Sequence, residues 1–173
     1  MTDDDLLRER FGILFRQSYP ELCSFVVQFV RSGAVAEELV QDLFLRLWER
    51  RAEWETELPS RSYLYQSARN RALDHLRHER IVQQTASRSA AEMEAERTET
   101  VPNTDLATQE LDLAIRRAIE QLPERTRQVF VLSRGHGLRY GQIAEALGIS
   151  VKTVEAQMGR ALRILRDRLR GYL

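Results

Sequence analysis

Residues 137–168 read GLRYGQIAEALGISVKTVEAQMGRALRILRDR, and their pattern indicates the fold of the C-terminal half of this chain. It predicts a helix, a tight turn at residues 148–150 and a second, longer helix. Gly148 can take the left-handed conformation that ends a helix, and Ser150 can cap the unpaired N–H groups that open the next one. A helix, a three-residue turn and a second helix form the arrangement that places the second helix in a DNA major groove.

The second helix has an apolar and a polar face when it is projected at about 100° per residue. We expect the apolar face to be core, and it consists of Val151, Val154, Met158, Ala161, Leu162, Leu165 and Leu169. The opposite face is basic and can contact phosphates and base edges. It consists of Lys152, Thr153, Ala156, Arg160 and Arg163, with Glu155 and Gln157 at its flanks. An amphipathic helix in an ordinary bundle would show the same pattern. Evidence from the other segments of the chain is therefore needed to distinguish a DNA-binding helix from such a bundle helix.

The composition indicates a soluble, all-α protein. The chain of 173 residues is 43% hydrophobic and 30% charged, and it contains only four prolines and eight glycines. It has no sustained alternation of apolar and polar residues, which strands would require. The formal net charge is zero, but arginines concentrate in residues 61–80 and 160–170, and acids in residues 1–5 and 92–112. Such local basic segments are compatible with nucleic-acid binding.

Two small helical domains joined by a flexible linker are expected. The first, residues 1–86, should contain helices over residues 6–30, 35–51 and 61–80, broken at residues 31–33 and by a loop at residues 54–62. Apolar periodicity then fades, and residues 87–108 form the linker, whose acids are Glu92, Glu94, Glu96, Glu99 and Asp105. The second domain, residues 109–173, starts with an amphipathic helix at residues 110–121, and Pro123 opens the helix that follows it.

The helix expected over residues 35–51 carries two distinct faces. Its core face is Ala36, Val40, Leu43, Phe44 and Leu47. Its far side is acidic and polar, with a leucine in the middle: Glu38, Gln41, Asp42, Leu45 and Glu49. A leucine ringed by polar groups is typical of a surface on which a partner helix packs. A single surface leucine is also common without any partner.

The helix expected over residues 61–80 is the second candidate for DNA contact. Its inner face is Tyr65, Ala68, Ala72 and Leu76, and Ser67, Asn70, Asp74 and Arg77 line the other side. Asparagine and arginine on an exposed helix can make bidentate contacts to base edges and charge-assisted bonds to phosphate. The alternative is a solvated surface. The further cations around this helix are Arg69, Arg71, His75, His78 and Arg80.

No group of residues indicates catalysis or a bound cofactor. The chain has no glycine-rich phosphate loop, no zinc-protease motif and no nucleophile elbow. The histidines of residues 61–80 have no Cys/His cluster to complete a metal site. We therefore expect no metal, no cofactor and no enzymatic activity.

Three segments resemble the extracytoplasmic-function (ECF) sigma factors, a family of bacterial RNA polymerase specificity subunits. They are AEELVQDLFLRLWERR at residues 36–51, SYLYQSARNRALDHLRHER at residues 62–80 and LPERTRQVFVLSRGHGLRYGQIAEALGISVKTVEAQMGRALRILRDRL at residues 122–169. Their order, their spacing and the total length fit that family. The third segment alone also resembles the C-terminal helix-turn-helix of LuxR-type response regulators, so a conventional helix-turn-helix regulator is the alternative function.

The resemblance implies a role for each segment. The segment at residues 38–48 would dock on the clamp coiled coil of core RNA polymerase through Glu38, Gln41, Asp42, Leu45 and Glu49. The segment at residues 54–80 would bind and open the promoter −10 element through Ser60, Arg61, Asn70, Arg71 and Arg77. The helix-turn-helix would read the −35 element, and the helices before it would touch the polymerase flap. Its DNA-contacting residues would be Lys152, Thr153, Glu155, Ala156, Gln157, Arg160 and Arg163.

The resemblance also implies roles for the linker and for a further partner. The linker would thread toward the active-site cleft and the RNA exit path of the polymerase, where its acids would imitate the charge of RNA. Family members are commonly held by an anti-sigma factor, and the long apolar faces here would suit one. The chain has no apolar signal core and no apolar run long enough to cross a bilayer, so we expect it in the cytoplasm.

Two places depart from the pattern of the family. Where members often carry serine or threonine followed by acidic residues, this chain has Arg139, Gly141 and Gln142, which implies a stronger phosphate contact. Where many members carry arginine, serine or another donor, this chain has Glu155 and Ala156. Glutamate can accept from cytosine, and alanine can only touch a thymine methyl or leave room. The −35 sequence should therefore differ from that of better-known members.

Overall fold

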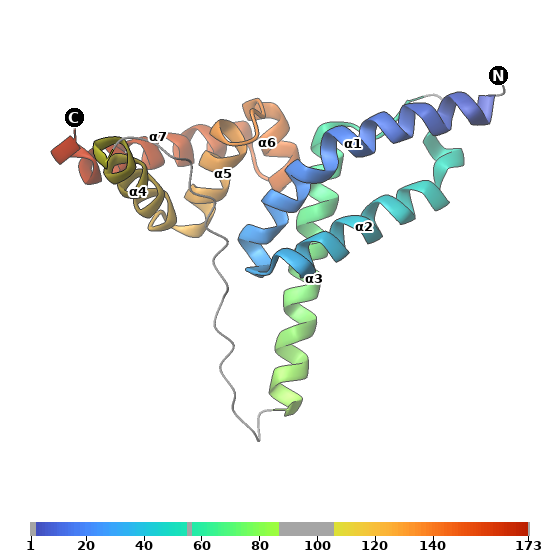
Figure 1. Ribbon diagram of the computed structural model, residues 1–173, viewed down its shortest axis with the longest axis horizontal. Helices are drawn as coiled ribbons and strands as arrows, with labels where there is room; N and C mark the ends of the chain where they lie inside the picture. Colours follow the sequence, from blue (N-terminus) through green and yellow to red (C-terminus); the bar gives the residue numbers. More distant parts are fainter. Residues whose placement is uncertain (1–2, 55–56, 87–105, 173) are drawn as a thin grey trace. The chain divides into compact units, whose positions relative to one another are not determined.

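The computed structural model describes residues 3–54, 57–86 and 106–172, and within them all regular structure is helical (Figure 1). The α-helices are α1 (Asp3–Val30), α2 (Gly33–Glu49), α3 (Arg61–Ala86), α4 (Leu106–Glu120), α5 (Glu124–Arg134), α6 (Tyr140–Leu147) and α7 (Val151–Arg168). Two 3-10 helices complete them, η1 (Arg51–Trp54) and η2 (Arg170–Tyr172). The predicted all-α class is confirmed. None of the described helices has the length and the apolar character that crossing a membrane requires.

The chain divides into two compact units, Met1–Glu96 and Arg97–Leu173. Most of the predicted linker, with its five acids, lies outside the described residues. α4 begins at Leu106, three residues before the predicted start of the second domain.

A sharp corner joins the first two helices of the N-terminal unit. Arg31 has a φ of 58°, in the left-handed region that turns the chain away from a helix. Ser32 then caps α2, because its Oγ accepts from the N–H of Val35 at 3.4 Å. The predicted break at residues 31–33 is confirmed, and its result is that α1 and α2 pack along each other.

The core of the N-terminal unit lies where α1, α2 and α3 meet. The five residues predicted as the core face of α2 are all buried. Aromatic rings join the helices, with Phe25 on α1 lying 5.1 Å from Tyr65 on α3 between ring centroids, and Phe15 on α1 lying 4.9 Å from Phe44 on α2. Phe25, Phe44 and Tyr65 are buried, and full burial of such a side chain is worth about 1.5–3 kcal/mol. This core holds the outer faces of α2 and α3 in fixed relation.

α3 is longer than predicted. It was expected to end at Arg80 but continues to Ala86, and Figure 1 shows it running past α1 and α2. Residues 81–86 contain no glycine or proline that would stop a helix, so the helix continues beyond Arg80. Its last turns are held by their own helical bonds and leave Ile81 and Val82 about half exposed.

The helix-turn-helix of the C-terminal unit has the predicted geometry. Gly148 is left-handed, with φ 65° and ψ 38°, and ends α6. The N–H of Ile149 donates to the carbonyl of Ala144 at 3.0 Å, which pairs one of the carbonyls left open at the helix end. Ser150 caps α7, because its Oγ accepts from the N–H of Thr153 at 3.1 Å. Both predictions for this turn are confirmed.

The predicted core face of α7 is right at its centre and wrong at its edge. Val154, Met158, Ala161 and Leu165 are buried, and Leu169 packs partly buried against the same cluster. Val151 is 44% exposed and Leu162 is 42% exposed. Val151 is the first residue of the helix, and Leu162 lies on the margin of the arc that the neighbouring helices cover. Both side chains are therefore part of the surface, not of the core.

Candidate nucleic-acid and polymerase interfaces

The outward face of α7 is a basic surface next to the helix-turn-helix corner. Of the seven residues predicted to contact DNA there, six are exposed: Lys152, Thr153, Glu155, Ala156, Arg160 and Arg163. Three of them are cations, and the core face of the helix is fixed on the opposite side by the buried residues that end at Leu165. The surface can therefore meet phosphates with its cations and base edges with its shorter side chains.

Gln157, the seventh residue, is placed differently. It is half-buried, and its Oε1 accepts from the hydroxyl of Thr126 on α5 at 2.6 Å. Thr126 is completely buried, and no pattern of the surrounding residues predicts a threonine in this core. The amide oxygen of Gln157 is thus turned into the unit. It ties α7 to α5, and a role in DNA reading stays a prediction.

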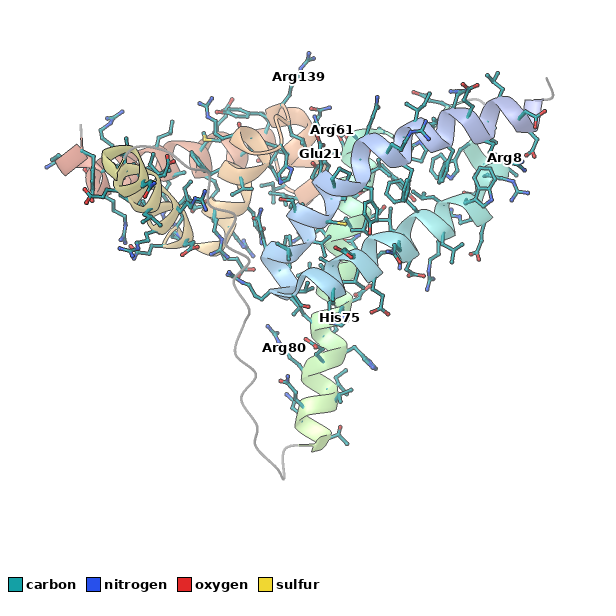
Figure 2. The ribbon with its side chains drawn as sticks, viewed as in Figure 1. Arg8, Glu21, Arg61, His75, Arg80 and Arg139 are labelled. Atoms are coloured by element: carbon teal, nitrogen blue, oxygen red, sulfur yellow. The ribbon has the colours of Figure 1, made fainter. Side chains whose placement is uncertain are left out.

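The N-terminal end of α6 presents one arginine to the surface. Arg139 precedes the helix, is exposed and extends outward in Figure 2. The side-chain Oε1 of Gln142 accepts from the backbone N–H of Arg139 at 2.9 Å. Gln142, expected from its departure from the family pattern to strengthen a phosphate contact, therefore closes the first turn of its own helix, and Arg139 is left as the exposed cation there.

The first two residues predicted to contact the −10 element support the start of α3. The Oγ of Ser60 accepts from the N–H of Tyr63 at 3.2 Å and caps the helix. Arg61 forms an ion pair with Glu21 of α1, with its Nη2 at 2.7 Å from Oε2, and Figure 2 shows the two side chains together. The hydroxyl of Tyr65 donates to the same carboxylate at 3.3 Å. Burial raises the pKa of Tyr65 well above its usual range.

The other predicted −10 contacts differ in their surroundings. Asn70 and Arg77 are exposed, and Arg77 pairs with Asp74 on its own helix at 3.0 Å. Arg71 is largely covered, and its Nη1 pairs with the carboxylate of Asp42 on α2. A residue predicted to contact DNA and a residue predicted to contact polymerase are thus bonded to each other.

A depression of about 310 Å³ lies beside this ion pair, between α2 and α3. Guanidinium groups, an aromatic ring and a hydroxyl line it, which are the groups that bind a phosphate, stack on a base and hydrogen-bond to its edge. Its lining residues are Leu43, Arg46, Leu47, Glu49, Arg50, Tyr63, Ser67 and Arg71.

The outer face of α2 has the predicted polar ring around one leucine. Leu45 is 56% exposed, and Glu38 and Glu49 are exposed on the same helix. The Nε2 of Gln41 donates to the hydroxyl of Tyr19 on α1 at 3.2 Å. Asp42 accepts from Arg46 at 3.2 Å in addition to its pair with α3. Leu45 is therefore the apolar centre of this face, while Asp42 is held in place by two cations.

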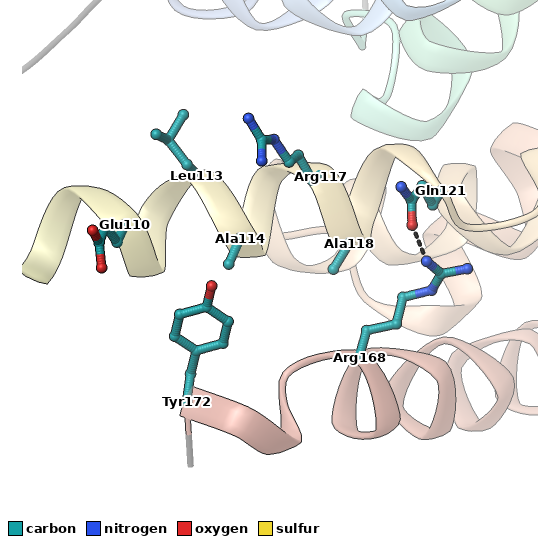
Figure 3. Close-up of a pocket in the computed structure, with 8 residues that line it drawn as sticks. All are labelled: Glu110, Leu113, Ala114, Arg117, Ala118, Gln121, Arg168 and Tyr172. Atoms are coloured by element: carbon teal, nitrogen blue, oxygen red, sulfur yellow. Dashed lines mark hydrogen bonds between the residues drawn. The ribbon is translucent and has the colours of Figure 1, made fainter.

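A groove of about 370 Å³ lies in the C-terminal unit between α4, the end of α7 and η2 (Figure 3). Figure 3 shows the ring of Tyr172 below α4, next to Ala114, and a hydrogen bond from Arg168 to the side-chain oxygen of Gln121. Leu113 and Tyr172 are about half exposed at this groove. It offers an apolar floor with arginines at its rim.

Comparison with known proteins places both units in one family. The family profile described as "Sigma-70 region 2" matches residues 14–81, and the profile described as "Sigma-70, region 4" matches residues 112–165. The chain is 31% identical over 169 residues to the RNA polymerase sigma factor CarQ of Myxococcus xanthus, covering 95% of this chain and 92% of CarQ. It is 30% identical over 158 residues to the ECF RNA polymerase sigma factor SigL of Mycobacterium tuberculosis, covering 88% and 87% of the two chains.

Solved structures show the same fold. The sigma factor RpoE of Bartonella quintana, in complex with the anti-sigma factor NepR, has a TM-score of 0.70 at 21% identity and covers 94% of this chain and 98% of its own. CnrH, in complex with the cytosolic domain of CnrY, has a TM-score of 0.62 at 22% identity and covers 98% and 99%.

The chain belongs to the ECF group of the sigma-70 family. It is an RNA polymerase sigma factor, a subunit that binds core RNA polymerase and directs it to promoter DNA, as the sequence predicted. The match of residues 14–81 to region 2 lies outside the helix-turn-helix. The resemblance to LuxR-type regulators covers only the C-terminal segment and does not account for the region 2 match. The comparisons therefore give no support to that alternative function.

Proposed function

We propose that the two units divide promoter recognition between them. The Met1–Glu96 unit binds core polymerase and opens the −10 element, and the Arg97–Leu173 unit reads the −35 element. The observation that carries this proposal is the exposed basic face of α7, whose first turn is capped by Ser150 at the corner of the helix-turn-helix. In such a motif the second helix lies in the major groove with its N-terminal residues at the base edges.

The polymerase clamp docks on the outer face of α2 in this proposal. Leu45, exposed at the centre of that face, fills an apolar pocket of the coiled coil, and Glu38, Gln41 and Glu49 form a polar rim around it. Such a buried apolar anchor within a polar rim is the usual anatomy of a strong protein contact. Asp42 acts within the protein by holding Arg71, so the clamp-facing side of α2 and the DNA-facing side of α3 form one rigid body.

The non-template strand of the −10 element runs along α3. Asn70 and Arg77 are exposed there, and the depression between α2 and α3 provides arginines with the ring of Tyr63. An unstacked base gains about 1–3 kcal/mol from stacking on an aromatic ring, which offsets part of the cost of opening the duplex. Ser60 and Arg61 contribute by fixing the start of the helix, because both are engaged within the protein.

The polymerase flap is the proposed occupant of the groove under α4. Leu113 and Tyr172 are half-exposed apolar residues of its lining, and the groove lies on α4, the first of the two helices that precede the helix-turn-helix. Contacts to polymerase by both units bring two weak DNA-reading surfaces onto one duplex. Their combined affinity is then raised by the effective concentration that tethering gives.

An anti-sigma factor is a further proposed partner. The two solved structures compared above are complexes, the sigma factor RpoE with the anti-sigma factor NepR and CnrH with the cytosolic domain of CnrY. The acidic linker, residues 87–108, is proposed to run toward the RNA exit path of the polymerase. The protein acts without catalysis and without a cofactor, in the cytoplasm, where bacterial RNA polymerase works.

The proposal is tested by charge reversal in a holoenzyme reconstituted with core polymerase. Arg160→Glu, on the basic face of α7, should abolish initiation at a promoter that depends on its −35 element, because repulsion from phosphates replaces attraction. Arg16→Glu, at an exposed arginine of α1 outside every surface proposed to meet DNA or polymerase, is the matched control and should retain activity. Equal activity of both variants with the unmodified protein would contradict the role of α7. A stable dimer in sedimentation, together with binding of that dimer to a palindromic DNA site without polymerase, would favour a conventional regulator.

A further inference from the structure

Gly159 stands in the middle of α7, on the face proposed to meet DNA. Its neighbours one turn before it are Glu155 and Ala156, and its neighbours one turn after it are Leu162 and Arg163, all of them exposed. Lys152 lies on the same side two turns before. The sequence patterns that predict DNA contacts overlook this position, because a glycine offers no side chain to contact anything.

The two structural reasons for a glycine are both absent here. The backbone at Gly159 is helical, and the glycines with a positive φ among the described residues are Gly137 and Gly148. No atom lies within 4 Å of the place where a Cβ would stand, apart from the adjoining backbone of its own helix. The described part of the protein therefore leaves room for any small side chain at this position.

The glycine weakens the helix that carries it. Of the residues found in helix interiors, only proline is less favourable, and alanine in place of an exposed interior glycine raises the folding equilibrium constant about fivefold. Gly33, Gly141 and Gly171 have equally open space and no positive φ, but they lie in the first turn of a helix or in η2, whereas Gly159 lies in a helix interior, where glycine is costly. Its place on the outward face of α7 agrees with a body outside the protein that approaches the helix backbone closely.

We propose that Gly159 is a specificity-determining residue, because the gap it leaves lets α7 sit deep enough in the major groove for Glu155 to reach a base. This inference rests on the proposed reading of the −35 element by α7. A major groove about 12 Å wide receives a helix about 10–12 Å across with its side chains, so the fit is close. Over the turn from Ala156 to Gly159 these two residues carry a single methyl group between them on the outward face of α7. Because so little side chain stands between the helix and the DNA there, the helix axis can lie nearer the floor of the groove.

The short side chain of Glu155 makes that approach necessary. A glutamate carboxylate can accept a hydrogen bond from the N4 amino group of cytosine, but its stem is shorter than that of the arginine or lysine that usually reads a base from a helix. The exposed cations Lys152 and Arg163 flank the gap and can hold phosphates on its two sides. Backbone proximity thus supplies the reach that the side chain lacks, and cytosine is the base read.

The test compares stability with promoter choice in three variants. Gly159→Ala and Gly159→Leu fill the gap in two steps with good helix formers. Gly12→Ala is the matched control, because Gly12 lies in the interior of α1, where a Cβ would meet only the mobile end of Arg16 at 3.4 Å. A promoter library transcribed by the unmodified protein with core polymerase first selects the best −35 sequence. Each variant is then assayed on that promoter and on the same promoter with its −35 element scrambled.

Gly159→Ala should raise Tm by several degrees and lower the ratio of initiation on the selected to the scrambled promoter about tenfold, the typical effect of one lost base contact. Gly159→Leu should lower that ratio further, and both should lose the preference for cytosine at the position where Glu155→Ala also loses it. Gly12→Ala should raise Tm and keep the ratio.

The inference is overturned if Gly159→Ala keeps the ratio while Arg160→Ala collapses it. It is equally overturned if Gly159→Ala lowers Tm, since the glycine would then serve the fold. A ratio that survives both Gly159→Ala and Arg160→Ala would instead show that α7 does not read the −35 element, which is the failure of the proposed function itself.

Discussion

The hydrogen bond between Thr126 and Gln157 allows a test of whether Gln157 stabilises the fold or reads DNA. Thr126 is completely buried on α5, and its hydroxyl donates to the Oε1 of Gln157 at 2.6 Å. Gln157→Ala removes that acceptor and leaves a buried hydroxyl without it, which costs about 1–3 kcal/mol. In a unit of roughly 60–100 residues each kcal/mol lowers Tm by about 4–8 °C. A fall of at least about 4 °C in the Tm of the C-terminal unit is therefore expected.

The reverse truncation should cost less. Thr126→Val keeps the shape of the buried side chain, and the half-buried Gln157 amide can turn to water, so a loss of about 0.5–1.5 kcal/mol is expected. The double variant Thr126→Val/Gln157→Ala should lose less stability than the sum of the two single losses, with a coupling of about 1 kcal/mol. Thermal unfolding of the full chain, followed by circular dichroism, measures all four proteins. Gln157→Ala with an unchanged Tm but a lost −35 preference would refute the structural role and make Gln157 a base reader.

Three further predictions concern the N-terminal unit. Leu45→Ala should change Tm by no more than about 2 °C, because the side chain is exposed, and should weaken binding to core polymerase at least tenfold in fluorescence anisotropy. Asp42→Asn should cost about 1 kcal/mol in urea unfolding by removing the partner of Arg71, and this loss should shrink in 1 M salt. Tyr65 keeps its proton in the folded state because burial raises its pKa, so the stabilisation that this gives is complete below about pH 10 and is lost as pH rises toward the raised value. The urea midpoint should therefore fall as pH rises above about 10, and Tyr65→Phe should flatten that fall.

The helix-turn-helix corner could be predicted because its signals are local. Gly148 must be left-handed and Ser150 must cap, and each requirement concerns only the neighbouring residues. The core face of α2 could be predicted for a similar reason, since periodicity gives the direction in which a helix is buried. Periodicity does not give the width of the arc that other helices cover. Val151 and Leu162 were assigned to the core for this reason and are exposed.

The ion pairs between helices could not be predicted. Arg61 meets a carboxylate 40 residues away, and Arg71 meets one 29 residues away, so neither partner leaves a local pattern in the sequence. The resemblance to the family implies DNA contacts for both arginines, and the structure shows each of them paired with a carboxylate inside the N-terminal unit. The roles predicted for the DNA-contacting and polymerase-contacting residues rest on the resemblance to the family. The structure adds which of these residues are exposed.

The most direct test of this account is run-off transcription with purified core RNA polymerase, paired with gel shift of the same promoter by the free protein. We expect the protein and core polymerase together to initiate at promoters carrying matched −10 and −35 elements. We expect the free protein to bind the same DNA only weakly, because each unit alone reads too little of it. Tight, sequence-specific binding by the free protein together with no initiation in the presence of core polymerase would contradict it.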